Sequence, residues 1–500
     1  MSDVLLAHAF FLRNDPKQAE KMRPYPPLGT LYAASHLREH GHSIALFDPM
    51  LADSEDEFAT LLDRHDPRFV VFYEDQFNWL NKMCLQHTRD AIGRMSGIAR
   101  ARNCVLIAAG ADVTDYPESY FDLGVHYALI GEADHSLCEL IDHLSSDGLP
   151  RNGTRIAGVR AAPSSSVEAT PFIPRRPERH PDVFPTPAWE LIDVEAYRRA
   201  WMDAHGFFSV NMVTTRGCPF HCNWCAKPIW GQRYAMRSPA NVAEEMAFIK
   251  RTIRPDHIWF ADDIFGLQPD WVVEFAEEVV ARDASIPFMI QSRMDLMSQA
   301  AVDALARAGC VEVWLGAESG SQRILDAMDK GITVEQIAQA RRRLGAAGIR
   351  ACFFIQLGYP GETIEDVHAT VNMVRTLVPD DIGVSVSYPL PGTRFYDMVQ
   401  SELRSKDHWH DSADLDMMFN GQYETPFYRT LRDVLHFELD VRRRMVANPT
   451  PPDLPANVRA LTDAWFELGR LEMEHRHLDP TDIHSTEPGV LTPDLSKRWG

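Results

Sequence analysis

The chain has 500 residues, enough for two or three domains, and its 45% hydrophobic content is ordinary for a globular protein. Fifty basic residues stand against 71 acidic ones, a formal net charge of −21, which argues against sequence-independent binding to nucleic acid. The first residues lack the basic flank and apolar core of a signal peptide, and no stretch of about 18 apolar residues occurs. We therefore expect a cytoplasmic protein with no membrane span and no nucleic-acid partner.

Residues 1–145 alternate short apolar runs with helical patterns, which is typical of an α/β domain with a parallel, doubly wound sheet. We predict helices that include 28–40 and 79–95, and five strands in a flavodoxin-like (Rossmann-like) order. Ligands of such sheets bind beyond the carboxyl ends of the strands, so the loops after strands one, three, four and five are candidate binding loops. The predicted strands are 4–7, 44–47, 69–73, 105–109 and 127–130.

The rest of the chain is predicted as a linker, a catalytic domain and a helical region. Residues 146–195 are rich in Pro, Ser and Arg, with a minor β element near 156–159. Residues 196–400 contain six βα units, which predict an open partial (β/α)6 barrel with its chemistry at the carboxyl ends of the strands. The six strands are 210–214, 257–261, 288–291, 311–315, 352–357 and 383–387.

Residues 401–500 read as helical and end in a polar tail. Several aromatic side chains in this region are candidates for either a hydrophobic core or a substrate channel. These aromatic residues are Trp409, Phe419, Tyr423, Phe427 and Tyr428.

Three cysteines, Cys218, Cys222 and Cys225, follow the first barrel strand with the spacing C-x3-C-x2-C. Three thiolates on a short loop can hold three irons of a 4Fe-4S cluster and leave the fourth iron open to another molecule. The alternatives are three unrelated buried cysteines or a zinc loop, although zinc normally takes four ligands at other spacings. The other five cysteines stand alone in apolar segments and are predicted as core residues. They are Cys84, Cys104, Cys138, Cys310 and Cys352.

The cysteine spacing, with Trp224 just before the third cysteine, resembles that of the radical S-adenosylmethionine (SAM) enzymes. The resemblance implies that the open iron chelates the amino and carboxylate groups of SAM. It also implies that the reduced cluster cleaves SAM to methionine and a 5′-deoxyadenosyl radical, with a flavodoxin- or ferredoxin-type protein as electron donor. No catalytic acid or base is assigned beyond the cluster.

The ends of the next four predicted barrel strands resemble the SAM-binding motifs of this family. The resemblance implies that two carboxylates accept hydrogen bonds from the amino group of SAM and that an arginine binds its carboxylate. It also implies that a Glu-Ser pair lies near the ribose or amino group and that a glycine turn contacts the adenine. The carboxylates could instead cap a helix, and the arginine could form a surface ion pair. The predicted SAM-binding residues are, in that order, Asp262, Asp263, Arg293, Glu318, Ser319 and Gly358.

Three motifs in residues 1–145 resemble the cobalamin-binding domain that precedes the radical SAM barrel in one subgroup. That subgroup includes class B methylases and the anaerobic magnesium-protoporphyrin ester cyclase. The motifs precede the first predicted helix, follow the second strand and follow the fifth strand, and no D-x-H-x-x-G motif supplies an axial histidine. The residues that the resemblance assigns to cobalamin are Pro27, Leu28, Gly29, Asp48, Gly131 and Glu132.

The resemblance implies a cobalamin-dependent C-methyltransferase that acts on an unactivated carbon of a small molecule, such as a secondary metabolite, a lipid-like compound or a tetrapyrrole. One SAM molecule methylates cob(I)alamin, a second yields the radical that abstracts hydrogen, and the substrate radical takes the methyl group. One alternative keeps the radical without methyl transfer, as in a cyclase, oxidase or rearrangement enzyme. Another is a non-catalytic cobalamin or redox sensor, against which the SAM motifs argue.

Overall fold

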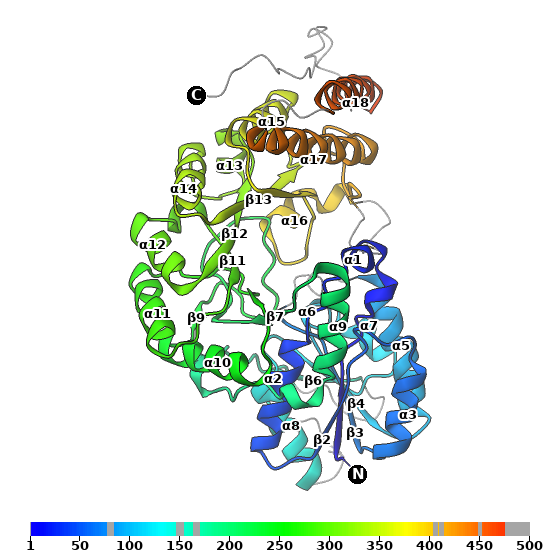
Figure 1. Ribbon diagram of the computed structural model, residues 1–500. Coiled ribbons are helices and arrows are strands. Elements are labelled where there is room, and N and C mark those ends of the chain that lie inside the picture. Colours follow the sequence, from blue (N-terminus) through cyan, green and yellow to red (C-terminus); the bar gives the residue numbers. More distant parts are fainter. Residues whose placement is uncertain are drawn as a thin grey trace. The chain divides into compact units, whose positions relative to one another are not determined.

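The computed structural model describes residues 2–77, 85–146, 155–163, 171–403, 409, 415–448 and 453–475 (Figure 1). The chain divides into two compact units. The first unit comprises Met1–Pro219, Ala226–Ile290 and His408–Asp414, and the second comprises Phe220–Cys225, Gln291–Asp407 and Leu415–Gly500. Cys218 therefore belongs to the first unit, whereas Cys222 and Cys225 belong to the second.

The first unit contains a six-stranded sheet in the order β2-β1-β3-β4-β5-β6. The first five strands pair in parallel, and β6 adds an antiparallel edge. The predicted flavodoxin-like order is confirmed, and the bounds of β1 to β4 are those predicted. The strands are β1 (Val4–Ala7), β2 (Ile44–Phe47), β3 (Phe69–Tyr73), β4 (Val105–Ala109), β5 (Tyr127–Leu129) and β6 (Val159–Ala161).

Helices cover both faces of this sheet because successive strand residues point to opposite sides. Val4 and Leu6 of β1 pack in one core with α2 (Leu28–Glu39) and α8 (Asp134–Ser146). Leu5 and Ala7 pack in the opposite core with α3 (Asp56–His65) and α5 (Gln86–Arg100). The other helices of this region are α1 (Pro16–Lys21), α6 (Ala111–Asp115) and α7 (Pro117–Asp122).

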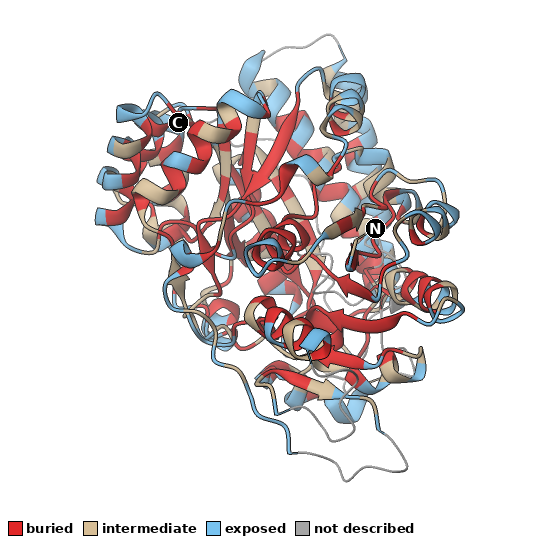
Figure 2. Ribbon diagram, turned by 90° about the horizontal axis from the view of Figure 1, so that it is seen from below, coloured by how far each residue is buried: buried red, intermediate tan, exposed pale blue. Residues whose placement is uncertain are grey.

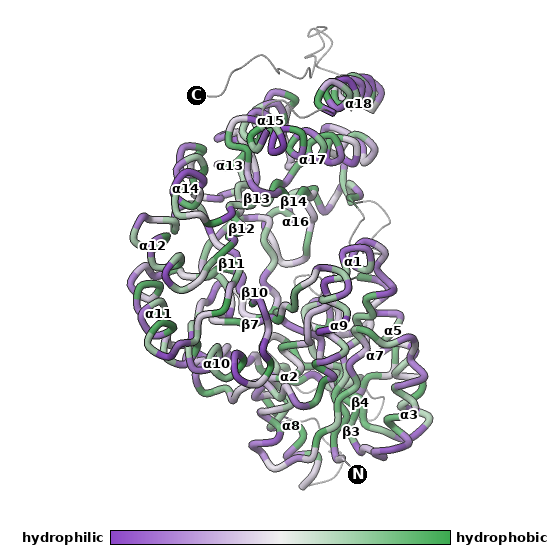
Figure 3. Tube along the Cα trace, viewed as in Figure 1, coloured by the Kyte–Doolittle hydropathy of each residue, from purple (hydrophilic) through white to green (hydrophobic). Residues whose placement is uncertain are grey.

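Burial and hydropathy follow the doubly wound pattern. In Figure 2 the strands are mostly buried, while the helices expose one side. In Figure 3 the hydrophobic colour is concentrated on strands such as β3 and β4. This pattern is the one expected of parallel strands that are covered on both faces.

The remaining part of the first unit begins the second sheet. Its elements are α9 (Val194–His205), β7 (Ser209–Met212), β8 (Thr215–Arg216), β9 (Ala235–Met236), α10 (Pro239–Thr252), β10 (His257–Phe260) and α11 (Pro269–Ala281). The indole of Trp201 donates to the Pro24 carbonyl at 2.6 Å, and the Asn211 amide donates to the Pro26 carbonyl at 3.0 Å. These bonds fix the segment that precedes α2 to the residues around β7.

The second sheet has the strand order β14-β13-β12-β11-β10-β7, which is the predicted six-stranded partial barrel. The pairs of β10 with β7 and β11, and of β13 with β12 and β14, are parallel. Two of the helices between the strands begin at hydrogen-bonded polar caps: Ser298 accepts from the Ala301 N–H, and Thr333 forms a capping box. The strands are β11 (Phe288–Ser292), β12 (Cys310–Glu318), β13 (Arg350–Leu357) and β14 (Asp381–Val386).

The second unit also carries a helical region that follows the barrel. Between or after its strands lie α12 (Gln299–Ala308), α13 (Gln322–Ala327), α14 (Val334–Ala346) and α15 (Ile364–Leu377), and after the last strand come α16 (Arg394–Val399), α17 (Thr425–Ala447) and α18 (Leu454–His475). The aromatic residues predicted as core or channel are buried, Trp409 in the first unit and the other four in the second. No helix in the described part of the chain is long and apolar enough to cross a membrane.

Candidate functional site

The three cysteines of the loop differ from the other described cysteines in exposure. Cys218, Cys222 and Cys225 are half-buried, whereas Cys104, Cys138, Cys310 and Cys352 are buried, as predicted for core residues; Cys84 lies outside the described residues. The turn into the loop requires glycine at position 217, where φ is +80° and an added Cβ would lie 2.4 Å from the Arg233 carbonyl oxygen. The paired strands β8 and β9 flank the loop.

Asn223 fixes the second half of the loop within the second unit. Its backbone N–H donates to the Met328 carbonyl at 3.0 Å, and its side-chain amide donates to the Ala327 carbonyl at 2.7 Å. The Tyr359 hydroxyl donates to the side-chain oxygen of Asn223 at 3.0 Å. These bonds hold the segment between Cys222 and Cys225 against the residues that follow α13 and β13.

Arg293, which follows β11, lies against the cysteine loop. Its guanidinium carbon is 3.7 Å from the centroid of the Phe220 ring, and its Nη1 is 3.9 Å from Sγ of Cys222. The same guanidinium pairs with Asp295 at 3.0 Å and donates to the Lys330 carbonyl at 2.9 Å. Only 6% of Arg293 is exposed, so the surface ion pair that the sequence left open is wrong.

Glu318 and Lys330 form a buried ion pair, with 2.7 Å between Oε1 and Nζ. Burial alone would lower the pKa of Lys330, but the Glu318 carboxylate and the Cys222 thiol together raise it. Glu318 lies at a bulge of β12 and has φ of +59°, in the left-handed region that is costly for a non-glycine residue. An added Cβ at Gly316 would lie 2.5 Å from Nζ of Lys330, so glycine leaves room for the pair.

The other predicted residues of the second unit are held by local hydrogen bonds. The Ser319 hydroxyl lies 3.0 Å from the Thr370 hydroxyl. Gly358 has φ of +71°, and its N–H donates to Oε2 of Glu362 at 2.6 Å. Burial raises the pKa of Glu362 to about 8, against the effect of this hydrogen bond. A neutral carboxyl thus lies behind the turn that follows β13.

Asp262, in the first unit, is buried, and both of its carboxylate oxygens accept hydrogen bonds. Oδ1 accepts from the N–H groups of Thr214 and Thr215 at 2.8 and 2.6 Å, and Oδ2 accepts from the Thr214 hydroxyl at 3.0 Å. Burial raises the pKa of Asp262 to about 6, and these hydrogen bonds oppose the rise. Asp262 therefore positions the chain that leads into the cysteine loop, and it is not a helix cap, the alternative that the sequence left open. Asp263, its neighbour, is exposed.

Glu132, one of the predicted cobalamin residues, is buried and fully hydrogen-bonded within the first unit. Its Oε1 accepts from Nη1 of Arg216 at 2.6 Å and from the Trp230 indole at 3.1 Å, and its Oε2 accepts from the Glu178 N–H at 2.6 Å. The adjacent Gly131 has φ of +76°. Glu132 thus connects the loop after β5 to the strand β8 that leads to Cys218.

The loops after β1, β2 and β3 meet through a second set of polar contacts. Asp48 lies 2.9 Å from Nε2 of His8 and accepts from the Tyr197 hydroxyl at 2.7 Å. The Gly29 N–H donates to Oδ1 of Asp75 at 3.0 Å. The other two residues of the first motif, Pro27 and Leu28, are the N-cap and the first residue of α2.

Glu74 lies in the loop after β3, beside a small recess. Burial raises its pKa to about 7, and the nearby His8 opposes the rise. The recess is lined by side chains from the loops after β3 and β4, so it lies at the edge where ligands of such sheets bind. Its lining includes Glu74, Leu85, Ala111, Asp112, Val113 and Tyr120.

Residues 212–374 match the model of the Radical SAM superfamily. The chain therefore contains a radical SAM domain. This match confirms the predicted radical SAM chemistry, with a 4Fe-4S cluster and SAM as cofactors. The matched residues run from the end of β7 into α15 and include the three cysteines and all the predicted SAM-binding residues.

Two curated relatives and one solved structure are similar to most of this chain. An uncharacterized methyltransferase of Pyrococcus horikoshii is 26% identical over 405 residues, which cover 80% of this chain and 84% of the relative. An anaerobic magnesium-protoporphyrin IX monomethyl ester cyclase of Rubrivivax gelatinosus is 26% identical, covering 78% of this chain and 68% of the relative. The structure of the cobalamin-dependent SAM radical enzyme OxsB with aqua-cobalamin superposes with a TM-score of 0.69 at 16% identity, over 94% of this chain and 72% of OxsB.

The sequence did not predict the two cations that pair with the predicted acidic residues: Arg216 pairs with Glu132, and Lys330 pairs with Glu318. Arg216 in the first unit and Lys330 in the second are buried cations, yet each looks in the sequence like an ordinary surface residue. Arg216 lies two residues before Cys218, and Lys330 ends the short turn after α13. The one available signal was the nearness of Arg216 to the cysteine motif in the sequence.

Proposed function

We propose that the chain is a cobalamin-dependent radical SAM methyltransferase that methylates an unactivated carbon of a small molecule. The observation that carries the proposal is the loop with three half-exposed thiols, one of which lies 3.9 Å from a buried guanidinium. The donor set fits a cluster with one open iron, because three thiols at this spacing can ligate three irons. We assign Cys218, Cys222 and Cys225 as the cluster ligands.

Residues 1–145 are proposed as the cobalamin-binding domain and residues 196–400 as the catalytic barrel. The match in fold to OxsB, which binds cobalamin, supports this assignment, as do the three motifs at one edge of the first sheet. The recess beside Glu74 lies at the same edge and is too small for a whole corrin, so it suits only a part of the cofactor. When bound, the cluster and cobalamin would supply the radical and the methyl group.

The chain's own residues would then orient and shield these groups. Arg293, already beside Cys222, is proposed to face the carboxylate of SAM, and the Glu318–Lys330 pair to keep that region polar. Asp262 and Glu132 are proposed to hold the chain on the amino-terminal side of the cysteine loop in place. Electrons are proposed to come from a flavodoxin- or ferredoxin-type donor in the cytoplasm.

An anaerobic assay tests the proposal. The protein is reconstituted with cluster and cobalamin and mixed with SAM, a reductant and candidate substrates, and S-adenosylhomocysteine and 5′-deoxyadenosine are quantified. The proposal expects equal yields of both, together with a methylated product. 5′-Deoxyadenosine without S-adenosylhomocysteine would instead indicate a cyclase-like reaction, for which the Rubrivivax cyclase is the precedent. If neither product forms with any substrate class, both proposals fail.

A further inference from the structure

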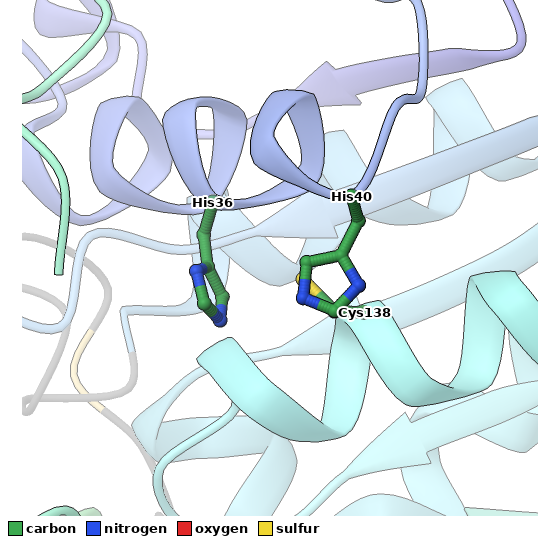
Figure 4. A group of neighbouring side chains, drawn as sticks. All are labelled: His36, His40 and Cys138. Atoms are coloured by element: carbon green, nitrogen blue, oxygen red, sulfur yellow. The ribbon is translucent and has the colours of Figure 1, made fainter. Parts of the chain in front are cut away.

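Three side chains with metal-binding atoms come together on the helices that cover one face of the first sheet (Figure 4). His36 lies in α2, His40 is the residue at its C-terminal end, and Cys138 lies in α8. One imidazole nitrogen from each histidine and Sγ of Cys138 lie within 4.8 Å of one another. We propose that these three residues bind a zinc ion that joins α2 to α8.

The ligand types and their spacing favour zinc. His36 and His40 are four residues apart, so they share one side of the helix, as the paired histidines of helical zinc motifs do. Zinc is commonly bound by imidazole and thiolate ligands, whereas calcium and magnesium are bound by oxygen ligands. Zinc bonds of about 2.0–2.3 Å place tetrahedral ligand atoms roughly 3.3–3.7 Å apart. Small rotations of these side chains would therefore close the site.

A carboxylate faces one ring nitrogen of His40. Nδ1 of His40 lies 2.9 Å from Oδ2 of Asp142. A metal-bound imidazole typically donates its other N–H to such a carboxylate, which leaves Nε2 of His40 for the metal. In Figure 4 both rings extend from α2 toward α8, and the sulfur of Cys138 lies behind the ring of His40.

The burial of His36 is also costly without a metal. Nδ1 of His36 is buried and has no hydrogen-bond partner in the described structure, and its Nε2 lies 3.1 Å from Nδ1 of His135. The nearby charged and titratable groups are Glu39, His42, Asp134, His135, Asp142 and Arg216.

The position of the site suggests its role. The helix α2 begins at Leu28 and α8 begins at Asp134, so each starts at one of the loops that we propose to contact cobalamin. A zinc ion between the two helices would fix the spacing of these loops. The zinc proposal itself rests only on the residues of the site and does not depend on the proposed methyl transfer.

Zinc binding can be measured on the full chain with Cys218, Cys222 and Cys225 all changed to Ala, since the cluster loop would otherwise compete for the metal. We expect this parent to retain one zinc per chain against a chromophoric chelator. Its cobalt(II) form should show a thiolate charge-transfer band. His40→Ala and Cys138→Ala should lose stoichiometric zinc, and Cys138→Ala should also lose the band. Asp142→Asn, which removes no ligand, should weaken binding by about 10- to 100-fold.

Cys104→Ala is the matched control, because Cys104 is also a buried cysteine of the same sheet region. It should bind zinc as the parent does. His40 is exposed, so His40→Ala tests the site with little risk to folding, which circular dichroism would check. The proposal is overturned if the parent retains no zinc, or if folded His40→Ala and Cys138→Ala retain as much as Cys104→Ala.

Discussion

Arg216 donates from Nη1 to Oε1 of Glu132 at 2.6 Å, and both side chains are almost fully buried. Nη1 also lies 2.9 Å from Oδ2 of Asp134. Arg216 lies two residues before Cys218, the first cysteine of the cluster loop. Its guanidinium thus binds two carboxylates that follow β5, one in the loop and one at the start of α8. The predicted cobalamin motif and the start of the cysteine loop are therefore parts of one buried ionic network.

Arg216→Ala should destabilise the protein by about 3–5 kcal/mol, because it leaves two buried carboxylates without their cation. Thermal unfolding should detect the change as a lower midpoint, with reduced iron incorporation. Arg160→Ala is the control, since Arg160 pairs with Glu118 at 2.7 Å on the surface. That exposed pair should contribute only about 0.2–1 kcal/mol. Equal midpoints for the two variants would contradict a structural role for the buried network.

Cys222→Ala should abolish the formation of 5′-deoxyadenosine, because a cluster with two remaining cysteine ligands is not held in the required geometry. Iron and sulfide analysis after anaerobic reconstitution, together with the product assay, measures the effect. Cys310→Ala, at a buried cysteine of β12, should keep both iron and product formation. Persistent 5′-deoxyadenosine formation by Cys222→Ala would refute the assignment of this residue to the cluster.

Much of the fold could be predicted because the strands are short, apolar and separated by helices. The bounds of β1 to β4 agree with the prediction, since each strand is a short apolar run between polar turns. The helix predicted over 79–95 is observed over Gln86–Arg100: residues 79–84 lie outside the described residues, Leu85 is extended, and the apolar spacing continues through Ala99. The predicted strand 311–315 extends to Glu318, because the small residues after Leu315 continue the pairing through a bulge.

The side-chain partners at the site could not be predicted in the same way. The sequence marks Asp262 and Glu132 as acids at strand ends, but it does not reveal that Thr214, Thr215 and Arg216 already occupy their oxygens. Such pairings depend on which strand ends become neighbours in the folded sheet. Asp262 thus follows β10, as predicted. The motif alone did not indicate that its carboxylate would accept hydrogen bonds from Thr214 and Thr215.

Stability should fall as the pH rises from about 5 to 8, because buried Glu74 and Glu362 have raised pKa values of about 7 and 8 in the folded protein. The folded state keeps their protons over this window while the unfolded state has lost them, so each unit of pH favours unfolding. Above pH 8 this contribution levels off. Thermal midpoints across the window measure the trend.

Glu74→Gln should flatten this pH dependence between about pH 5 and 7, because the amide does not titrate. Glu20→Gln, at an exposed glutamate of α1, should leave the slope unchanged. If Glu74→Gln and the unmodified chain show the same slope, Glu74 is ionised in the folded protein and the expected burial cost is absent.

Gly316→Ala should disturb the Glu318–Lys330 pair without removing either charge, because the new Cβ would lie 2.5 Å from Nζ of Lys330 and 2.6 Å from Oε1 of Glu318. We expect a loss of about 1–3 kcal/mol in stability from this crowding. The yield of 5′-deoxyadenosine should also fall, since Lys330 and Arg293 meet beside Cys222. Gly469→Ala in α18, where nothing lies within 4 Å of the added Cβ, should be neutral or stabilising by up to about 1 kcal/mol. If Gly316→Ala matches Gly469→Ala in stability and product yield, the buried pair has no part in SAM cleavage.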